Sequence, residues 1–438
     1  MEKVIFESLF KIPLRNGVTK PKKVRGQGYK MVNMGEIFSY SFIENIKMDR
    51  VPLTSKEKQN SFLEDQDLLF ARQSLVLSGA GKCSIFISDK EDVCFESHII
   101  RCRLNKETVN PLYYFYYFNS VEGRENIKRI TEQGAGAAGI RGSELSKLEV
   151  PFVEKKIQDK VVDTLYSYDK KIQLNTDTNR TLEQIAQTVF QHWFIDFAPV
   201  RAKAQARAQG KSAVDIERAA MMSLSGKTAD ELTALATRNP TAYTDLQTLA
   251  SAFPDELTTT EHGEVPKGWE YKKITDVCNV VYGKGLPKNK LKEHGFPVYG
   301  ANGVIGYSEN YLYEKPQVLI GCRGTVGKVS ICEPFSFVTS NSLVIEYEKS
   351  NISLYYLERF LKNKDLSVFS SGSVQPQITI QNISKLEILI PSKEVHSLFV
   401  KRVNNLYEKI YMNNKENLSL GNTRDVLLPQ LLNGEVKL

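Results

Sequence analysis

The feature that most constrains this chain is that its two halves repeat one another. The tetrapeptide Ser146-Lys147-Leu148-Glu149 recurs 238 residues later as Ser384-Lys385-Leu386-Glu387. Upstream, Leu112-Tyr113-Tyr114 recurs as Leu354-Tyr355-Tyr356, and Gly81-Lys82 recurs as Gly327-Lys328, at the slightly longer spacings that loop insertions cause. Two copies, rather than the three or more of a solenoid, predict a duplicated molecule with approximate internal twofold symmetry.

Each copy ends in a segment with a seven-residue apolar repeat. The repeat lasts about four to five heptads, which predicts a left-handed coiled coil. In the first copy the expected seam is Val161, Leu165, Tyr168, Ile172, Asn175, Asn179, Leu182 and Val189. In the second copy it is Phe399, Val403, Leu406, Ile410, Asn413, Asn417, Leu420 and Leu427. We expect these helices, each about 55–65 Å long, to pack together as an antiparallel spacer rod, with parallel packing left open.

Asparagines occupy the same seam positions in both copies, at 175 and 179 and again at 413 and 417. A buried amide costs stability unless it is paired, so one interpretation is a device that fixes the register of the two helices. The other is that these residues tolerate solvent near one end of the seam. The sequence favours neither.

The front part of each copy has the pattern of a mixed α+β domain. Short β-rich runs such as Cys83–Ile87, Val318–Cys322 and Ser342–Tyr347 are separated by Gly, Asn and Pro turns. Aromatic helical stretches at Tyr113–Phe118 and Leu354–Phe360 are expected to pack on these strands rather than to stack on bases. The fold class is therefore α+β: two globular domains, each followed by a long helix.

A segment between Arg201 and about Phe253 has no counterpart in the other copy. It is rich in alanine, and Thr228-Ala229-Asp230-Glu231 has the form of a capping box that opens a short helix ending before Pro240. We interpret it as a partly helical connector outside the two repeats. Its alternative role is a basic arm that binds nucleic acid.

Composition sets wider limits. The chain has 438 residues, a net charge of +7 and 25% charged residues, which excludes disordered, collagen-like and disulfide-scaffold proteins. Its six cysteines form no C-x-x-C pair and its histidines do not join them at zinc spacings, so reduced structural thiols and no metal site are expected. We find no secretory pattern and no apolar run that would span a membrane, so the cytoplasm is the expected compartment.

Basic residues gather in turn-rich parts of both domains and are candidate phosphate contacts. They lie near glycines that let a backbone approach a ligand, Gly26 and Gly28 in the first domain and Gly283 and Gly285 in the second. Each cluster alone is more typical of a solvated loop, but basic loops at corresponding places in both copies make nucleic-acid binding an equally good interpretation. The residues are Lys20, Lys22, Lys23, Arg25 and Lys30, followed by Lys284, Lys288, Lys290 and Lys292.

Enzyme motifs fail on inspection. The glycine-rich runs at 134–139, 77–83 and 322–329 lack either a surrounding βαβ unit or the spacing and hydroxyl residue of a phosphate loop. Asn110-Pro111-Leu112-Tyr113 is one residue away from the Asn-Pro-Pro-Tyr of amino-methyltransferases, but Pro111 is better explained as the first turn of a helix. With no catalytic residues identified, we expect no chemistry from this chain; the alternative is a self-sufficient methyltransferase or nuclease with degraded motifs.

Three stretches carry a family resemblance. Residues 181–197 (TLEQIAQTVFQHWFIDF) with the following Val200-Arg201-Ala202-Lys203, Val265-Pro266-Lys267-Gly268-Trp269, and residues 424–436 (RDVLLPQLLNGEV) resemble the DNA-specificity subunit of Type I restriction-modification enzymes. The resemblance covers nearly the whole chain. The first domain lacks a Pro-x-Gly-Trp start, which leaves its true beginning undefined.

The resemblance implies a division of labour. Residues 1–150 and 266–390 would be target-recognition domains that read the halves of a bipartite, asymmetric double-stranded DNA site. Residues 151–197 and 391–438 would be the central and C-terminal coiled-coil helices, and 198–265 the connector. Two modification (methyltransferase) subunits and the restriction (translocase and nuclease) subunits would join them and carry S-adenosylmethionine, ATP and Mg²⁺. This chain would bind no cofactor and no membrane.

Candidate base readers follow from side-chain chemistry. Arg72 and Arg323 are candidates for guanine edges or phosphates, and Asn341, Gln375 and Gln377 for bidentate pairing with adenine. Their first-domain equivalents, His98, Ala137 and Gly139, differ, as expected for unlike half-sites. Each is equally typical of a structural polar residue. Lys82, Lys328, His98 and Arg141 complete the candidate set.

Overall fold

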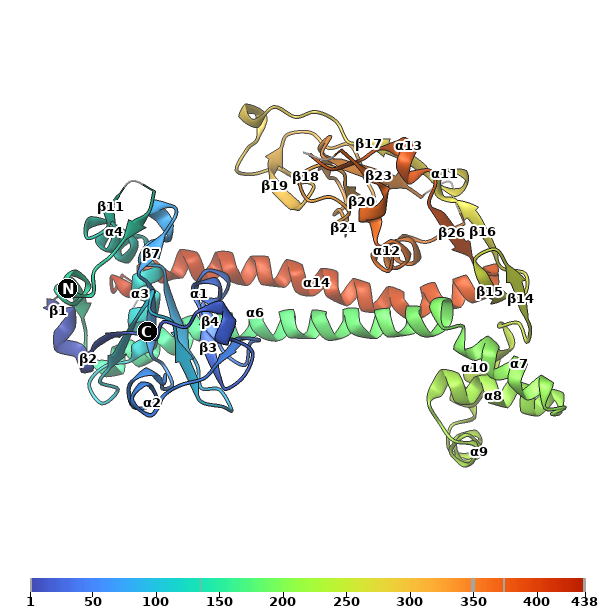
Figure 1. Ribbon diagram of the computed structural model, residues 1–438, viewed down its shortest axis with the longest axis horizontal. Helices are drawn as coiled ribbons and strands as arrows, with labels where there is room; N and C mark the ends of the chain where they lie inside the picture. Colours follow the sequence, from blue (N-terminus) through green and yellow to red (C-terminus); the bar gives the residue numbers. More distant parts are fainter. Residues whose placement is uncertain (1, 135, 348–350, 373–374, 436–438) are drawn as a thin grey trace. The chain divides into compact units, whose positions relative to one another are not determined.

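The computed structural model describes residues 2–134, 136–347, 351–372 and 375–435. The described chain divides into two compact units, Met1–Thr176 with Asn414–Leu438 (unit 1) and Asp177–Asn413 (unit 2). The long helices α6 (Lys155–Phe190) and α14 (Lys393–Leu432) each contribute one stretch to each unit (Figure 1).

The body of unit 1 is built on a sheet with strand order β2-β10-β6-β8-β4 and a second sheet with order β5-β3-β9. The strands of the first sheet are β2 (Phe10–Asn16), β4 (Phe42–Ile43), β6 (Leu68–Ala71), β8 (Cys83–Phe86) and β10 (Ile99–Leu104). Those of the second are β3 (Tyr29–Val32), β5 (Asp49–Val51) and β9 (Val93–Phe95). Smaller sheets pair β1 (Glu2–Ile5) with β13 (Glu149–Phe152), and β7 (Gln73–Ser74) with β12 (Ala138–Gly139) and β11 (Glu132–Gln133).

Short helices connect these strands. They are η1 (Phe6–Leu9), η2 (Lys22–Val24), α1 (Met34–Ser39), α2 (Ser55–Ser61), η3 (Leu77–Gly79), α3 (Pro111–Asn119), α4 (Val121–Arg129) and α5 (Gly142–Ser146). Asn110 caps α3 and Pro111 opens it, which confirms the expected role of that proline. The glycine-rich run at 134–139 includes Ala135, which lies outside the described residues; its ends belong to the short hairpin β11-β12.

Unit 2 contains a sheet with order β17-β23-β20-β21 and another with order β19-β18-β22. These strands are β17 (Asn279–Tyr282), β18 (Phe296–Gly300), β19 (Gly303–Ser308), β20 (Val318–Gly321), β21 (Val329–Ile331), β22 (Phe337–Val338) and β23 (Ser342–Glu346). Pairs join β16 (Glu270–Lys273) to β26 (Glu387–Ile390), β24 (Ser370–Ser371) to β25 (Gln377–Ile378), and β14 (Leu257–Thr260) to β15 (Gly263–Pro266). The helices between them are α11 (Ile274–Val277), η5 (Lys288–Lys290), α12 (Leu354–Lys362), η6 (Leu366–Phe369) and α13 (Ile380–Ile383).

The internal repeat is confirmed strand by strand. The order β2-β10-β6-β8 in unit 1 is matched by β17-β23-β20-β21 in unit 2, and β5-β3-β9 by β19-β18-β22. The parallel pair β3-β9 has its counterpart in the parallel pair β18-β22. The pair β1-β13, directly before α6, corresponds to β16-β26, directly before α14.

The aromatic stretches form the core, as expected. Every residue from Pro111 to Phe118 in α3 is buried, and Tyr356, Leu357, Phe360 and Leu361 of α12 are buried in the same way. These side chains pack on the sheets of their own unit. They are not free to stack on bases.

The long helices pair antiparallel in each unit, which confirms the expected coiled coil. In unit 1, Asp169 forms an ion pair with Arg424, and Asn175 Nδ2 donates to Asn417 Oδ1 at 2.9 Å. In unit 2, Asn413 Nδ2 donates to Asn179 Oδ1 at 2.8 Å, and the Phe190 and Phe399 ring centroids are 6.1 Å apart. In both units, residue numbers rise along one helix as they fall along its partner.

Three of the four seam asparagines are buried and Asn417 is half-buried, and one amide hydrogen bond joins the members of each pair. Asn175 is 3% exposed and Asn413 is 1% exposed, and both lie well inside their helices. The interpretation that they tolerate solvent at one end of the seam is therefore wrong. The interpretation that paired amides fix the register of the two helices remains. The other predicted seam residues are all buried or half-buried: Val161, Leu165, Tyr168, Ile172, Leu182, Val189, Phe399, Val403, Leu406, Ile410, Leu420 and Leu427.

After α6, a short π-helix at Gln191–Ile195 leads into a helical segment of unit 2 (Figure 1, green). It comprises α7 (Ala198–Ala208), α8 (Ala213–Ser225), α9 (Ala229–Arg238) and α10 (Pro240–Ser251). Thr228 and Glu231 form the predicted capping box, and α9 ends before Pro240 as expected. The segment has a small core of its own around Ala220, Met221, Leu232 and Ala250.

All six cysteines are buried free thiols. Burial raises the pKa of Cys94 to about 12 and that of Cys332 to about 11, so these thiols stay protonated and unreactive. Within the described residues, no helix combines the length and apolar character needed to cross a membrane.

Candidate nucleic-acid interface

A frame of backbone hydrogen bonds positions the candidate base readers of unit 1. At the end of β6, the Arg72 N–H donates to the His98 carbonyl at 2.8 Å, and the Ile140 N–H donates to the Arg72 carbonyl at 3.0 Å. Three segments far apart in the sequence thus meet at Arg72. The side chains of Arg72 and His98 are exposed there, and Gly139, next to Ile140, contributes none.

Unit 2 repeats this frame with other side chains. The Cys322 N–H donates to the Asn341 carbonyl at 2.8 Å, and the Ile378 N–H donates to the Cys322 carbonyl at 3.1 Å. Asn341 therefore corresponds to His98, and Gln377 to Gly139, as the sequence spacing implied. The backbone counterpart of Arg72 is Cys322 rather than Arg323, so the two candidate arginines lie one residue out of register.

The readers of unit 2 contact one another. Arg323 Nε donates to Gln377 Oε1 at 3.2 Å, while Asn341 and Gln375 are exposed. Gln377 thus orients the guanidinium group of Arg323 instead of standing free to pair with a base. Unit 1 has Gly139 at this position, which has no side chain to orient Arg72 in the same way.

The lysines that follow the repeated Gly-Lys turns are engaged with protein. Lys82 Nζ donates to the Phe38 carbonyl at 2.7 Å, and Lys328 Nζ donates to the Asn302 carbonyl at 3.1 Å. Burial, with the nearby Arg124 charge, lowers the pKa of Lys82. Both lysines tie a neighbouring loop to the frame, which makes them weaker candidates for phosphate binding.

A proline-led turn carries the exposed lysines of each basic loop. Pro21 precedes η2 and Pro287 precedes η5. Each proline carbonyl accepts a hydrogen bond from the N–H three residues later, from Val24 at 3.1 Å and from Lys290 at 2.9 Å. Lys22 and Lys23 in the first turn, and Lys288 and Lys290 in the second, are exposed. The two basic loops therefore do occupy corresponding places in the two units.

The remaining cations of the first loop are neutralised by carboxylates. Lys20 Nζ lies 2.9 Å from Glu57 Oε2, and Arg25 Nη1 lies 2.8 Å from Asp49 Oδ2. Lys30 Nζ lies 2.9 Å from Asp89 Oδ1, and the hydrogen bond to Asp89 raises the pKa of Lys30. These three residues stabilise the loop and present less free charge than the sequence suggested.

In unit 2, Lys284, Lys288 and Lys290 are exposed, and Lys292 Nζ forms an ion pair with Glu309 at 3.2 Å. In unit 1, Arg141 is exposed and pairs with Glu132 at 2.8 Å. Exposed ion pairs of this kind contribute little and open readily when a phosphate competes.

Two glycines in these loops serve the protein rather than a ligand. A Cβ atom on Gly28 would lie 2.4 Å from the Val51 carbonyl oxygen, and one on Gly283 would lie 2.3 Å from that of Thr339. Both sites need glycine because protein backbone passes close by. Gly26 and Gly285 meet no such neighbour.

The sequence did not single out the exposed apolar residues Leu75, Val76 and Leu77, which lie in the loop after β7 of unit 1. Three consecutive apolar residues in a β-rich region are typical of a buried strand, so the sequence carries no signal of their exposure.

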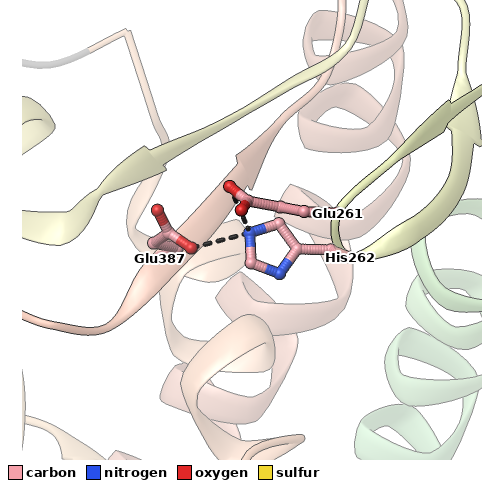
Figure 2. Close-up of side chains that lie close together, drawn as sticks. All are labelled: Glu261, His262 and Glu387. Atoms are coloured by element: carbon pink, nitrogen blue, oxygen red, sulfur yellow. Dashed lines mark ion pairs between the residues drawn. The ribbon is translucent and has the colours of Figure 1, made fainter.

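One group of potential metal ligands lies in unit 2 (Figure 2). His262 Nε2 is 2.7 Å from Glu387 Oε2 and 3.8 Å from Glu261 Oε1, and the imidazole ring lies 4.4 Å from the Tyr271 ring. Glu261 and His262 sit in the β14-β15 turn and Glu387 begins β26. The histidine nitrogen is already used by Glu387, and Glu261 and His262 are exposed while Glu387 is half-buried, which fits a polar contact that fastens the hairpin to the domain.

Comparison with known proteins agrees with this architecture. Residues 2–184 and 266–421 match the family described as Type I restriction modification DNA specificity domain. The chain is similar to the Type I restriction enzyme HindI specificity subunit of Haemophilus influenzae, with 33% identity over 92% of this chain and 94% of that protein. It is also similar to the MjaIX specificity subunit of Methanocaldococcus jannaschii, with 23% identity over 96% and 89% of the two chains.

Among solved structures, the S subunit of a Type I restriction-modification system from M. genitalium has the same fold, with a TM-score of 0.53. The match spans 98% of this chain and 95% of that one at 18% identity. The internal repeat and the antiparallel helix pairing define a duplicated α+β protein with two similar globular domains. The chain belongs to the family of Type I restriction-modification specificity subunits.

Proposed function

We propose that this chain is the noncatalytic subunit that gives a Type I restriction-modification complex its DNA sequence specificity. The observation that carries the proposal is the repeated backbone frame with different side chains: Arg72 and His98 in unit 1, Arg323, Asn341 and Gln377 in unit 2. One scaffold with two unlike sets of readers suits a site whose two halves differ.

The proposed division of the chain follows its elements. Residues 1–150 and 266–390 are target-recognition domains, 151–197 and 391–438 the coiled-coil helices, and 198–265 a helical connector. Phosphate contacts come from the proline-led turns, through Lys22 and Lys23 in the first and Lys288 and Lys290 in the second, because these cations are exposed.

Catalysis belongs to the partners. Two modification subunits with S-adenosylmethionine dock mainly on the helices, and restriction subunits with ATP and Mg²⁺ join that core. The cap of α3 supports this assignment, because Asn110 and Pro111 have a structural role at the start of that helix.

The direct experiment sequences the methylated adenines in a host that carries the complex. We expect a bipartite motif with unlike halves, and no methylation by this chain alone. Methylation by the isolated chain would reverse the assignment in favour of a self-sufficient methyltransferase.

Helix length should set the spacer between the half-sites. Inserting one heptad into each helix, after Thr176 and after Asn413, adds about 10 Å, or about three base pairs. We expect the spacer to lengthen while both half-sites stay the same; an unchanged spacer would contradict the ruler role of the helices.

A further inference from the structure

The loop between β6 and β8 of unit 1 is longer than its counterpart. In unit 1 the Ala71 N–H donates to the Lys82 carbonyl and the Gly81 N–H to the Ala71 carbonyl, at 2.9 and 2.8 Å. In unit 2, Gly321 makes the same two bonds with Lys328 and Gly327, both at 2.8 Å. Between these fixed points, unit 1 has a loop from 72 to 81 and unit 2 one from 322 to 327, so unit 1 carries four extra residues.

The longer loop presents three consecutive apolar residues to solvent. Leu75 is 89% exposed, Val76 61% and Leu77 40%. A folded domain gains by burying such side chains, so a contiguous exposed set generally marks a contact surface. The unit 2 loop is polar instead and carries Arg323 and Thr325.

The loop is held in this exposed conformation. Arg124 donates to the Gly81 carbonyl at 2.9 Å and to the Ser78 carbonyl at 2.6 Å, and the Val76 N–H donates to Ser74 Oγ at 3.2 Å. A Cβ atom on Gly79 would lie 2.2 Å from Ser74 Oγ, so the turn closes tightly on itself. A preformed loop binds without an ordering cost.

Basic side chains surround the loop. The exposed Arg72 side chain and Lys82 stand at its two ends in the chain, and the frame brings the exposed His98 to Arg72. Basic side chains around an apolar tip match DNA, where phosphates flank the apolar surfaces of the bases. An apolar groove on a protein offers the tip the same contact but gives the exposed Arg72 guanidinium no anionic partner.

We propose that Leu75, Val76 and Leu77 form an apolar finger that enters a groove of the DNA and packs on bases of the half-site read by unit 1. The inference rests on the proposed function. The apolar base surface is either the 5-methyl group of thymine or the face of a partly unstacked base step. Unit 1 then adds apolar contact to its polar candidates Arg72 and His98, whereas the candidate readers of unit 2 are all polar.

The test uses the assembled complex of this chain with its modification subunits. The double variant Leu75→Ser/Val76→Ser is compared with the wild type and with Val214→Ser, which replaces a 74% exposed valine in α8, outside both domains. Motifs are obtained by selection from a random DNA library, and Arg323→Ala identifies the half-site read by unit 2. We expect the double variant to lose discrimination in the other half-site and to bind at least tenfold more weakly, while Val214→Ser matches the wild type.

Two DNA probes then identify the apolar surface. Replacing each thymine of that half-site by deoxyuridine should weaken wild-type binding several-fold, with no effect on the double variant, if the finger contacts a methyl group. A rise in 2-aminopurine fluorescence with the wild type alone identifies an unstacked step. If neither probe responds, the finger does not contact bases.

The outcomes separate the two proposals. A wild-type complex without a selected motif would refute the proposed function itself. A normal wild-type motif that the double variant retains in full would refute the finger alone. Loss of binding to the modification subunits with an unchanged motif would assign Leu75 and Val76 to a protein contact and overturn the DNA role.

Discussion

The two units share a backbone frame and a core but differ at the edge where the frame is exposed. The bonds that join 72 to 98 and 140 in unit 1 are those that join 322 to 341 and 378 in unit 2. The side chains at these points are unlike, and one loop is longer. The difference teaches that the duplicated fold fixes the positions of the candidate readers, while loop length and side chains differ between the units and, under the proposed function, determine which bases each unit reads.

The shared core provides the largest expected effects. Tyr114 in α3 donates to the Pro151 carbonyl at 3.2 Å, and Tyr356 in α12 donates to the Leu389 carbonyl at 2.6 Å. Both side chains are fully buried, and both tie an aromatic helix to the strand that precedes a long helix.

We expect Tyr114→Ala and Tyr356→Ala each to lower the free energy of unfolding by about 3–5 kcal/mol, because each leaves a large cavity. Tyr→Phe at either site should cost only about 1 kcal/mol, for the lost hydrogen bond. Urea denaturation gives the size, and amide hydrogen exchange shows where protection is lost. If one substitution reduced protection from hydrogen exchange equally in both units, the two units would not unfold separately, contrary to this expectation.

The asparagine layers give the next largest effect. Asn413→Leu removes the donor to Asn179 and should cost about 1–3 kcal/mol, because a buried amide loses its hydrogen bond. The double variant Asn179→Leu/Asn413→Leu should recover most of this loss, since both polar partners are replaced by apolar ones. A double-mutant cycle measured by urea denaturation yields the coupling. The Asn175 and Asn417 layer of unit 1 is the matched control, and no coupling in either layer would contradict the register role.

How far the sequence predicted the molecule depends on the range of the interactions. The repeat and the heptads predicted the duplicated fold and the paired helices, because a repeated motif and a seven-residue period can both be read directly from the sequence. The free charge of Lys20 and Lys30 was overestimated, since their partners, Glu57 and Asp89, lie 37 and 59 residues away. The exposure of Leu75 was not predicted, because it depends on long-range hydrogen bonds. The backbone frame and the bonds from Arg124 hold this apolar run in a conformation that faces solvent.

The start of each long helix allows a pH-dependent comparison. In unit 1, Gln158 Oε1 accepts from the Asn110 N–H at 2.7 Å; in unit 2, at the same repeat position, His396 Nε2 accepts from the Ser353 N–H at 3.0 Å. Burial lowers the pKa of His396 below its ordinary value of 6.5, so the folded chain takes up this proton less readily than the unfolded chain. The contribution of His396 to stability is therefore complete above pH 6.5 and falls as the pH drops below it.

We expect acidification to pH 5 to destabilise unit 2 by about 1 kcal/mol at this contact, because a protonated imidazole cannot accept the Ser353 N–H. His396→Gln copies unit 1 and should remove this part of the pH dependence. Thermal unfolding at pH 7.5 and pH 5 measures it, with Gln158→Glu as a reciprocal variant that introduces titration in unit 1. An identical pH dependence in wild type and His396→Gln would contradict the role of this histidine.

The smallest expected effect separates exposed from neutralised lysines. Lys22→Ala should reduce the slope of log affinity against log salt by about 0.9 and weaken binding to all DNA sequences alike, because one phosphate contact is lost. Lys288→Ala should do the same in unit 2. Lys20→Ala is the control: its ammonium group is bound to Glu57, so the salt slope should stay close to that of the wild type. Fluorescence anisotropy titrations at salt concentrations between about 50 and 200 mM give the salt slope of all three variants. If Lys20→Ala lowers the slope as much as Lys22→Ala, the ion pair opens on DNA, and the whole basic loop rather than its proline-led turn contacts the phosphates.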